Sequence, residues 1–212
     1  DFDGNGTMDA TGETLAPFTY NQANTYPAKL FIQTAEGPLT CTRQVVVEPT
    51  TVATITVAPS TTTLDVDATQ QFSVTGADQF GNAITFGHSN VTWSVLASDA
   101  GTVNPSTGLF TAGTTADTFN DAVQASASYK GGPVTDTASV VVEPGAIFNL
   151  EIQERGQTIE VATPFTFTVL GYDQYGNEIP QVAIEAAPST LTWEATTPAA
   201  GVIDPQSGLF TA

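Results

Sequence analysis

The first residues of the chain carry a pattern that suits metal binding. Side-chain oxygens alternate along the chain at Asp1, Asp3, Asn5 and Asp9, and the backbone carbonyl of Thr7 falls in the same alternation. This spacing matches the first nine positions of the EF-hand-type calcium-binding loop, in which alternate oxygens wrap around a hard cation. A divalent ion would also relieve the repulsion among the clustered acids. We therefore predict that these residues ligate calcium.

The same loop departs from the full calcium pattern at its end. Position 12 is Gly12, and the candidate bidentate acid, Glu13, comes one residue late. A strand is expected to follow from near Leu15, where a complete calcium loop would lead into a helix. We expect residues 1–13 to bind calcium with the affinity of extracellular modules. A solvated acidic turn is the alternative.

The rest of the chain offers little for catalysis. It contains a single histidine, His88, and a single cysteine, Cys41, so neither a zinc cluster nor an internal disulfide is expected. There is no Gly-x-Ser-x-Gly elbow and no glycine-rich phosphate loop. A catalytic pair of carboxylates of the glycosidase type is an alternative that the sequence leaves open, although most acids fall in turn clusters. We expect a protein that is not an enzyme.

The charge balance narrows the possible partners. Acidic residues number 22 and basic residues 4, which gives a formal net charge of −18. Nucleic-acid binding rests on clustered Lys and Arg that neutralise phosphates, and this composition excludes it. An anionic surface instead favours divalent cations and solubility. No apolar run approaches the roughly 20 residues that span a bilayer, so direct membrane insertion is not expected.

The chain repeats itself. Three segments occur twice, and two of these pairs are identical at more than half of their positions while the third is identical throughout. The pairs are Phe72–Thr85 with Phe167–Pro180, Ala100–Ala112 with Ala200–Ala212, and Val45–Pro49 with Val140–Pro144. Such self-similarity indicates tandem copies of one domain, and the last pair reads as a final strand with a short linker. We predict three units, at residues 1–49, 50–144 and 145–212.

The copies differ in two respects. A short insertion separates Ile179 from Trp193 in the second copy, and we place it in a loop, where insertions cost little. The sibling unit also continues well beyond the point that matches Ala212. We therefore expect residues 145–212 to lack their C-terminal strands and residues 1–49 to lack their first strands. Residues 145–212 should therefore be unstable in isolation.

The hydrophobic pattern within each unit has a period of two. Val91, Trp93 and Val95 alternate with Thr and Ser, and turn residues recur every few positions. This pattern predicts an all-β chain of antiparallel sandwiches in which helix is nearly absent. We place Trp93 and Trp193 in the cores, where a sandwich needs a large side chain.

A turn follows one strand in each copy, at Asp78–Asn82 and Asp173–Asn177. The Asp can accept hydrogen bonds from backbone N–H groups of the turn while the Gly takes a positive φ, so we interpret both segments as structural turns. The aromatic residues near these turns could instead form a sugar-binding platform. They are Phe80, Tyr172 and Tyr175.

Residues 50–212 resemble the bacterial Ig-like (Big) families, which occur in tandem in adhesins, invasin- and intimin-like proteins and surface-layer proteins. The likeness is carried by the Asp-Gln-Phe/Tyr-Gly-Asn turn, the later Trp strand and the Pro-x-x-Gly-Leu-Phe-Thr-Ala segment. Residues 1–49 resemble the second half of a polycystic-kidney-disease-type (PKD) domain. That likeness rests on Asp1–Asp9, Phe18–Tyr20 and Tyr26–Thr34.

The resemblance implies tandem immunoglobulin-like β-sandwich domains in a large extracellular prokaryotic surface protein. Its implied role is that of a non-enzymatic stalk or fibre, structural or adhesive. Its implied partners are other domains of the same long chain, neighbouring protomers, and cell-surface glycans or proteins. Two alternatives stay open: a carbohydrate-binding or accessory module of a secreted hydrolase, and a self-assembling surface-layer or filament subunit.

Overall fold

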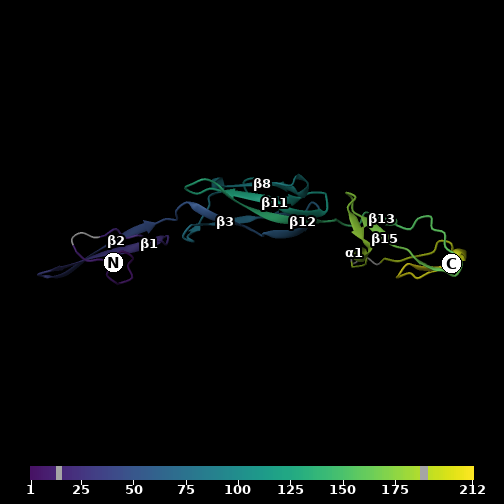
Figure 1. Ribbon diagram of the computed structural model, residues 1–212, viewed down its shortest axis with the longest axis horizontal. Coiled ribbons are helices and arrows are strands. Elements are labelled where there is room, and N and C mark those ends of the chain that lie inside the picture. Colours follow the sequence, from purple (N-terminus) through teal and green to yellow (C-terminus); the bar gives the residue numbers. More distant parts are fainter. Residues whose placement is uncertain (13–15, 187–190) are drawn as a thin grey trace.

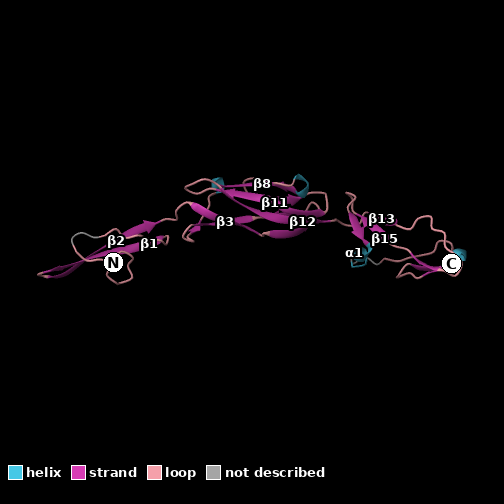
Figure 2. Cartoon of the chain, in the orientation of Figure 1, coloured by secondary structure: helices cyan, strands magenta, loops and turns pink. Residues whose placement is uncertain are grey.

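The computed structural model describes residues 1–12, 16–186 and 191–212. The regular secondary structure of the described residues is β-strand, apart from one short α-helix and three single turns of 3-10 helix, and loops connect these elements (Figure 2). Three units follow one another along an elongated chain, with the two termini at opposite ends (Figure 1). The predicted all-β class, with tandem immunoglobulin-like β-sandwich units, is confirmed. None of the described helices has the length and apolar character needed to cross a membrane.

The first unit consists of a long loop and one hairpin. Strands β1 (Asn24–Thr34) and β2 (Gly37–Val47) pair antiparallel along their whole length. Glu13 and the start of the strand expected near Leu15 lie outside the described residues. Residues 16–23 form no strand, so the first strand begins later than the sequence predicts.

The central unit contains ten strands in three small sheets. Their orders are β3-β6-β7, β4-β12-β11-β8 and β5-β10-β9. The 3-10 turns η1 (His88–Asn90) and η2 (Ser98–Ala100) flank β8. The strands are β3 (Val52–Ala58), β4 (Thr61–Asp65), β5 (Thr69–Gln71), β6 (Ser73–Asp78), β7 (Ala83–Ile84), β8 (Val91–Val95), β9 (Gly101–Val103), β10 (Leu109–Ala112), β11 (Asp117–Ala127) and β12 (Val134–Glu143).

One pairing in the central unit is parallel, which corrects the expectation of purely antiparallel sheets. Strand β4 runs parallel to β12, with Thr61 opposite Ser139 and Asp65 opposite Glu143. Strand β3 is antiparallel to β6, and Pro59 lies between β3 and β4. Because proline has no N–H to give to a ladder, the chain leaves β6 at this point and continues beside β12. Side chains along Thr61–Asp65 alternate between the two faces of the sheet whichever way the strand runs, so the sequence pattern does not reveal its direction.

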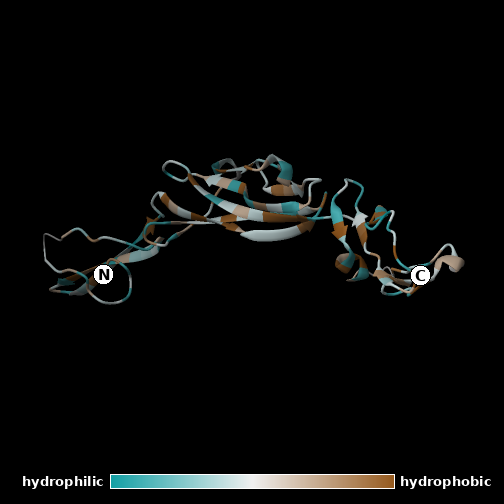
Figure 3. Cartoon of the chain, turned by 45° about the vertical axis from the view of Figure 1, so that its right-hand side comes forward, coloured by the Kyte–Doolittle hydropathy of each residue, from teal (hydrophilic) through white to brown (hydrophobic). Residues whose placement is uncertain are grey.

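The core of the central unit is built by alternation along its strands. Figure 3 shows apolar residues, in brown, on the strands of the central unit. Buried and less buried positions alternate along the second half of β11 and of β12, and Val123, Ala125 and Ala127 are all fully buried. Residues from all three sheets pack into one cluster. Trp93 is 5% exposed within it, so the predicted core position of this residue is confirmed.

The last unit reproduces two of these three sheets. The order β13-β15-β16 corresponds to β3-β6-β7, and β14-β18-β17 corresponds to β5-β10-β9. Its elements are β13 (Asn149–Ile152), β14 (Pro164–Thr166), β15 (Val169–Tyr172), β16 (Glu178–Pro180), α1 (Gln181–Ala186), η3 (Pro198–Ala200), β17 (Val202–Ile203) and β18 (Leu209–Thr211).

The counterpart of β8 in the last unit is not a strand. Residues 191–195 carry the same pattern as Val91–Val95, but the structure assigns no ladder to them. In the central unit β8 pairs with β11, and the described residues of the last unit contain no equivalent of β11. Trp193 is nevertheless 9% exposed, which confirms its predicted burial. Helix α1 occupies part of the region where the sequence predicts a loop insertion, and residues 187–190 there lie outside the described part.

Candidate functional site

Three carboxylates converge in the loop at the start of the chain. One oxygen each of Asp1, Asp3 and Asp9 lies within 4.8 Å of the others. Asp1 is buried, and its two oxygens accept the backbone N–H groups of Gly4 at 2.7 Å and Gly6 at 3.1 Å. Both glycines have positive φ, which lets the backbone curl around the Asp1 carboxylate.

The other predicted ligands are engaged within the same loop. The Asn5 Oδ1 atom accepts the Thr7 N–H at 2.7 Å, and the Asn5 Nδ2 group donates to Asp3 Oδ2 at 2.8 Å. Asp9 Oδ2 accepts the N–H of Phe2 at 2.5 Å. The structure therefore brings the three acids together and holds Asn5 beside them. Glu13, the candidate bidentate acid, lies outside the described residues.

The donor set fits a hard divalent cation. Calcium takes oxygen ligands at about 2.3–2.6 Å, so two ligand oxygens on opposite sides of one ion are separated by about 5 Å at most. The carboxylate oxygens of Asp1, Asp3 and Asp9 fall within this limit. Each carboxylate oxygen that accepts an amide N–H keeps a second lone pair for a metal.

Aromatic packing and the hairpin position the loop. The rings of four aromatic residues contact one another in tilted or edge-to-face pairs, in the order Phe2, Phe18, Tyr20 and Tyr26. The Tyr20 hydroxyl donates to the Phe2 carbonyl at 2.8 Å. Burial raises the Tyr20 pKa, and the nearby charges of Asp3 and Asp9 raise it further. The loop therefore has a negative potential that reaches this phenol.

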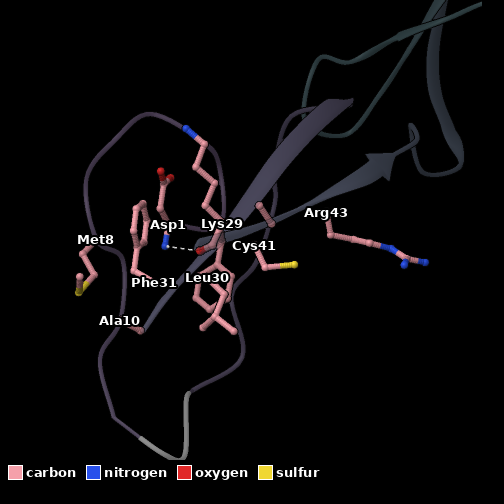
Figure 4. A pocket seen from close by; sticks show the side chains of 10 residues that line it. Asp1, Met8, Ala10, Lys29, Leu30, Phe31, Cys41 and Arg43 are labelled. Atoms are coloured by element: carbon pink, nitrogen blue, oxygen red, sulfur yellow. Dashed lines mark hydrogen bonds between the residues drawn. The ribbon is translucent and has the colours of Figure 1, made fainter. Parts of the chain in front are cut away.

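A shallow hollow of about 250 Å³ lies between the loop and the hairpin (Figure 4). It is lined mainly by apolar side chains, including Met8, Leu30 and Phe31, and Cys41 also lines it. The Lys29 N–H donates to the Asp1 carbonyl at 2.8 Å, which ties the loop to β1. This contact holds the carboxylates at a fixed place on the hairpin.

A second site lies at the junction between the first and central units. Asp78 is buried, and its Oδ1 atom accepts the N–H groups of Phe80 and Asn82, each at 2.9 Å. Its Oδ2 atom accepts the Thr50 N–H and the Asn82 side-chain amide, also at 2.9 Å. These hydrogen bonds outweigh burial and hold the pKa of Asp78 far below its usual range. The predicted capped turn is confirmed, and Gly81 has the expected positive φ.

Asn82 extends this turn to the neighbouring unit. Its Oδ1 atom accepts the N–H of Ala23 at 2.8 Å, and its Nδ2 group donates to the carbonyl of Asn21 at 3.1 Å. Both partners precede β1 in the first unit. The turn is thus at once a local cap and a contact between units.

The junction between the central and last units has the same construction. Asp173 is buried and accepts the N–H groups of Tyr175, Asn177 and Gly145 and the Asn177 side-chain amide, at 2.7 to 3.0 Å. These bonds lower its pKa to about 2 against the opposing effect of burial. Asn177 Oδ1 accepts the N–H of Ala116 and Asn177 Nδ2 donates to the carbonyl of Thr114, each at 2.9 Å.

Each junction also has contacts of its own. At the first, Lys130 Nζ donates to Glu48 at 2.7 Å and to the Pro49 carbonyl at 3.0 Å. At the second, the Tyr175 hydroxyl donates to the Asp67 carboxylate of the central unit. Phe80 occupies the same position at the first junction and has no hydroxyl to make such a bond. The Tyr175 pKa is raised, first by this bond and then by burial.

The proposed aromatic sugar platform is not assembled among the described residues. Phe80 and Tyr175 are 49% and 44% exposed, but they belong to turns at opposite ends of the central unit (Figure 1). Tyr172 lies in β15 and is half-buried. Phe80 therefore shares no flat surface with the other two aromatic residues.

Sequence reasoning missed the contact between units. It assigned the Asp and Gly of the repeated turn a role but gave the final Asn none. The signal was present, because Asn82 and Asn177 recur at the same position of the two copies. What the sequence does not contain is the position of the preceding unit's backbone.

A comparison with known protein families finds a match within the central unit. Residues 51–118 match the family model of the bacterial Ig-like domain (group 2). That match begins just before β3 and ends within β11, and it includes the Asp78 turn and Trp93. Comparison with curated proteins found no match.

Several solved structures are similar to the chain. Surface layer protein SbsC, domains 1-6, is 22% identical over 76% of this chain, with a TM-score of 0.34. The protocadherin GammaB4 extracellular domain is 14% identical over 89%, with a TM-score of 0.43, and mouse cadherin-23 EC22-24 is 13% identical over 88%, with a TM-score of 0.37. The chain covers 21%, 34% and 62% of these three chains respectively.

Proposed function

We propose that the chain is a non-enzymatic structural segment of a prokaryotic surface protein, a stalk of Ig-like units that holds other parts of that protein at a set distance and angle. The observation that carries this proposal is the repetition of one hydrogen-bonded turn at both junctions of an elongated chain (Figure 1). A catalytic or small-ligand role would not require two such junctions.

Location and partners follow from the same role. We place the stalk outside the cell, where its partners are further units of the same long chain, neighbouring protomers, and cell-surface glycans or proteins. The bacterial Ig-like match over residues 51–118 and the net charge of −18 support this placement. The long hairpin β1–β2 supports the interpretation of residues 1–49 as part of a PKD-like unit.

Small-angle X-ray scattering of the full chain tests the stalk. We expect a rod-like particle whose maximum dimension matches the extended arrangement and does not depend on protein concentration. A compact particle, or a scattering curve typical of freely jointed units, would contradict the proposal. Growth of the particle with concentration would instead favour the self-assembling subunit.

We further propose that calcium stabilises the first unit through Asp1, Asp3 and Asp9, with Asn5 and the Thr7 carbonyl completing the shell. The support is the convergence of three carboxylates on a space that fits one ion. Ligation would require Asn5 to turn its Oδ1 atom from the Thr7 N–H or to share it. The expected affinity is that of extracellular modules, with a Kd of about 10⁻⁴ to 10⁻³ M.

Calorimetry of the full chain with calcium tests this metal site. Binding to the folded form alone should stabilise it by about 2.7 kcal/mol at about a hundredfold excess over Kd, and a chelator should reverse the gain. The double variant Asp3→Asn and Asp9→Asn should lose the calcium heat. Asp99→Asn, an exposed acid of the central unit, should retain it. Equal heats in the two variants would leave the loop as an acidic turn.

A further inference from the structure

At each of the two junctions, the Asn carboxamide binds one backbone N–H and one backbone carbonyl. In each, the Asn carboxamide accepts the N–H of one residue and donates to the carbonyl two residues earlier in the preceding unit. The pairs are Ala23 with Asn21 and Ala116 with Thr114. The residue that donates its N–H is Ala at both junctions, whereas the residue that supplies the carbonyl is Asn at the first and Thr at the second. The backbone groups and their spacing are the same at both junctions.

We propose that the Asp-Gln-aromatic-Gly-Asn turn is a docking site for a short backbone segment of the preceding unit, and that it fixes the angle between consecutive units without a metal ion. This inference rests on the proposed stalk, which it deepens by naming the joint. The partner of the site is the peptide backbone of the unit before it.

The chemistry of the Asn side chain fits such a partner. A carboxamide carries an acceptor oxygen and a donor nitrogen in one plane, so it can complement a backbone N–H and C=O at the same time. Asn82 is also held in place, because its own N–H and Nδ2 group donate to Asp78. The carboxamide is therefore oriented before the neighbouring unit docks, which lowers the entropy lost on docking.

The buried Asp connects the turn to the linker as well. Asp78 Oδ2 accepts the N–H of Thr50, which directly follows Pro49, and Asp173 Oδ2 accepts the N–H of Gly145, which follows Pro144. Each junction therefore has two separate sets of hydrogen bonds. One joins the Asp to the linker, and the other joins the Asn to the preceding unit. Two separate connections restrict bending and twisting more than either one alone.

The carboxylates at the joints have little capacity left for a cation. Asp78 accepts five hydrogen bonds, two at Oδ1 and three at Oδ2 when the Thr50 hydroxyl is included. Asp173 accepts two at each oxygen. A metal would have to displace these donors, so the hydrogen bonds themselves compensate the buried charge.

Spin-label distances in the full chain test the first joint. Cys41 is an exposed free thiol in the first unit, and Ser94→Cys adds a second exposed label site on β8. We expect a narrow distance distribution that is unchanged by a chelator. Asn82→Ala should broaden it and shift its mean, and Ala23→Pro, which removes the donated N–H but leaves the Asp78 turn intact, should do the same. Asn104→Ala is the matched control, because Asn104 caps a turn within the central unit.

The second joint is tested in a Cys41→Ser background with labels at Ser94→Cys and Gln153→Cys. Asn177→Ala and Ala116→Pro should broaden this distribution, and Tyr175→Phe should broaden it less because it removes only the bond to Asp67. Narrow distributions in the Asn and Pro variants would overturn the docking site while leaving the stalk in place. Broadening of the unsubstituted chain by chelator would overturn the metal-free joint, and broad distributions without any treatment would overturn the stalk itself.

Discussion

At the scale of single residues, each tryptophan is matched to a glycine. A Cβ atom on Gly108 would lie 2.7 Å from Trp93 Cε2, and one on Gly208 would lie 2.9 Å from Trp193 Cε2. Both glycines also have positive φ, at 74° and 69°. The repeated Gly-Leu-Phe-Thr-Ala segment therefore needs its glycine twice over, for the backbone turn and for the indole ring that packs against it.

Truncation of the central tryptophan measures this packing. Trp93→Ala should lower the free energy of unfolding by about 3–5 kcal/mol, because it removes a buried ring and leaves a cavity against Phe72. Urea unfolding followed by circular dichroism gives the value. Ser94→Ala, next to it on the exposed face of β8, should change the free energy little. A loss below about 1 kcal/mol for Trp93→Ala would mean that the ring is not part of the core.

Acid should weaken the last unit through Asp173. Its folded-state pKa of about 2 lies below the unfolded value of about 3.9. The carboxylate therefore stabilises the unit fully above pH of about 4, and this contribution is lost as the pH falls toward 2. Trp193 fluorescence in a Trp93→Phe background follows the unit. Asp173→Asn should flatten the dependence of unfolding free energy on pH between these values. Glu160→Gln, which changes an exposed acid of the same unit, should give a steeper dependence than Asp173→Asn.

At the scale of elements, strand formation at residues 191–195 depends on a neighbouring strand. Residues 191–195 have the alternation of β8, yet they form no ladder in the absence of an equivalent of β11. Trp193 Nε1 is buried without a hydrogen-bond partner in the described residues. An uncovered edge of this kind presents unpaired backbone groups with which another chain can pair.

Expression of separate units tests this dependence. Residues 50–144 alone should unfold in one cooperative transition, because their three sheets close around one core. Residues 145–212 alone should show no such transition and should aggregate, because their smaller cluster leaves Trp193 near an open side. Melting followed by circular dichroism and light scattering distinguishes the two. A monomeric, cooperative transition for residues 145–212 would refute the expectation.

The elements that the sequence predicted are those with a local signal. Alternation around Trp93 predicts a half-buried strand, and Asp78 with Gly81 predicts a capped turn, since both depend on neighbours in the chain. The parallel direction of β4 could not be predicted, because its alternation suits either direction. The convergence of Asp1, Asp3 and Asp9 follows from their spacing within one loop. The bond from Asn82 to Ala23 depends on how two units meet, which no local pattern encodes.

At the scale of the whole molecule, the net charge of −18 acts on every unit at once. The described residues contain two salt bridges, at Lys130 with Glu48 and at Arg155 with Glu151. Most acids therefore repel one another across a narrow chain, and this repulsion disfavours the folded state. Salt should screen it.

Stability should consequently rise with ionic strength. Between about 0.01 M and about 0.1 M salt the screening length falls from about 30 Å to about 10 Å, which removes most repulsion between distant acids. Urea unfolding in sodium chloride with chelator present measures this effect apart from calcium. Choline chloride should act similarly, because the effect depends on ionic strength. A midpoint that stays constant or falls would contradict the expectation.

The parallel pairing of β4 with β12 decides how the central unit responds to mechanical tension. A pulling force that enters from the first unit and leaves through the last acts on these two strands in opposite senses along their length. The five residue pairs from Thr61 with Ser139 to Asp65 with Glu143 are then loaded in shear, all together. An antiparallel pair in the same place would be peeled apart one hydrogen bond at a time. We therefore expect the central unit to yield abruptly at high force rather than by gradual peeling.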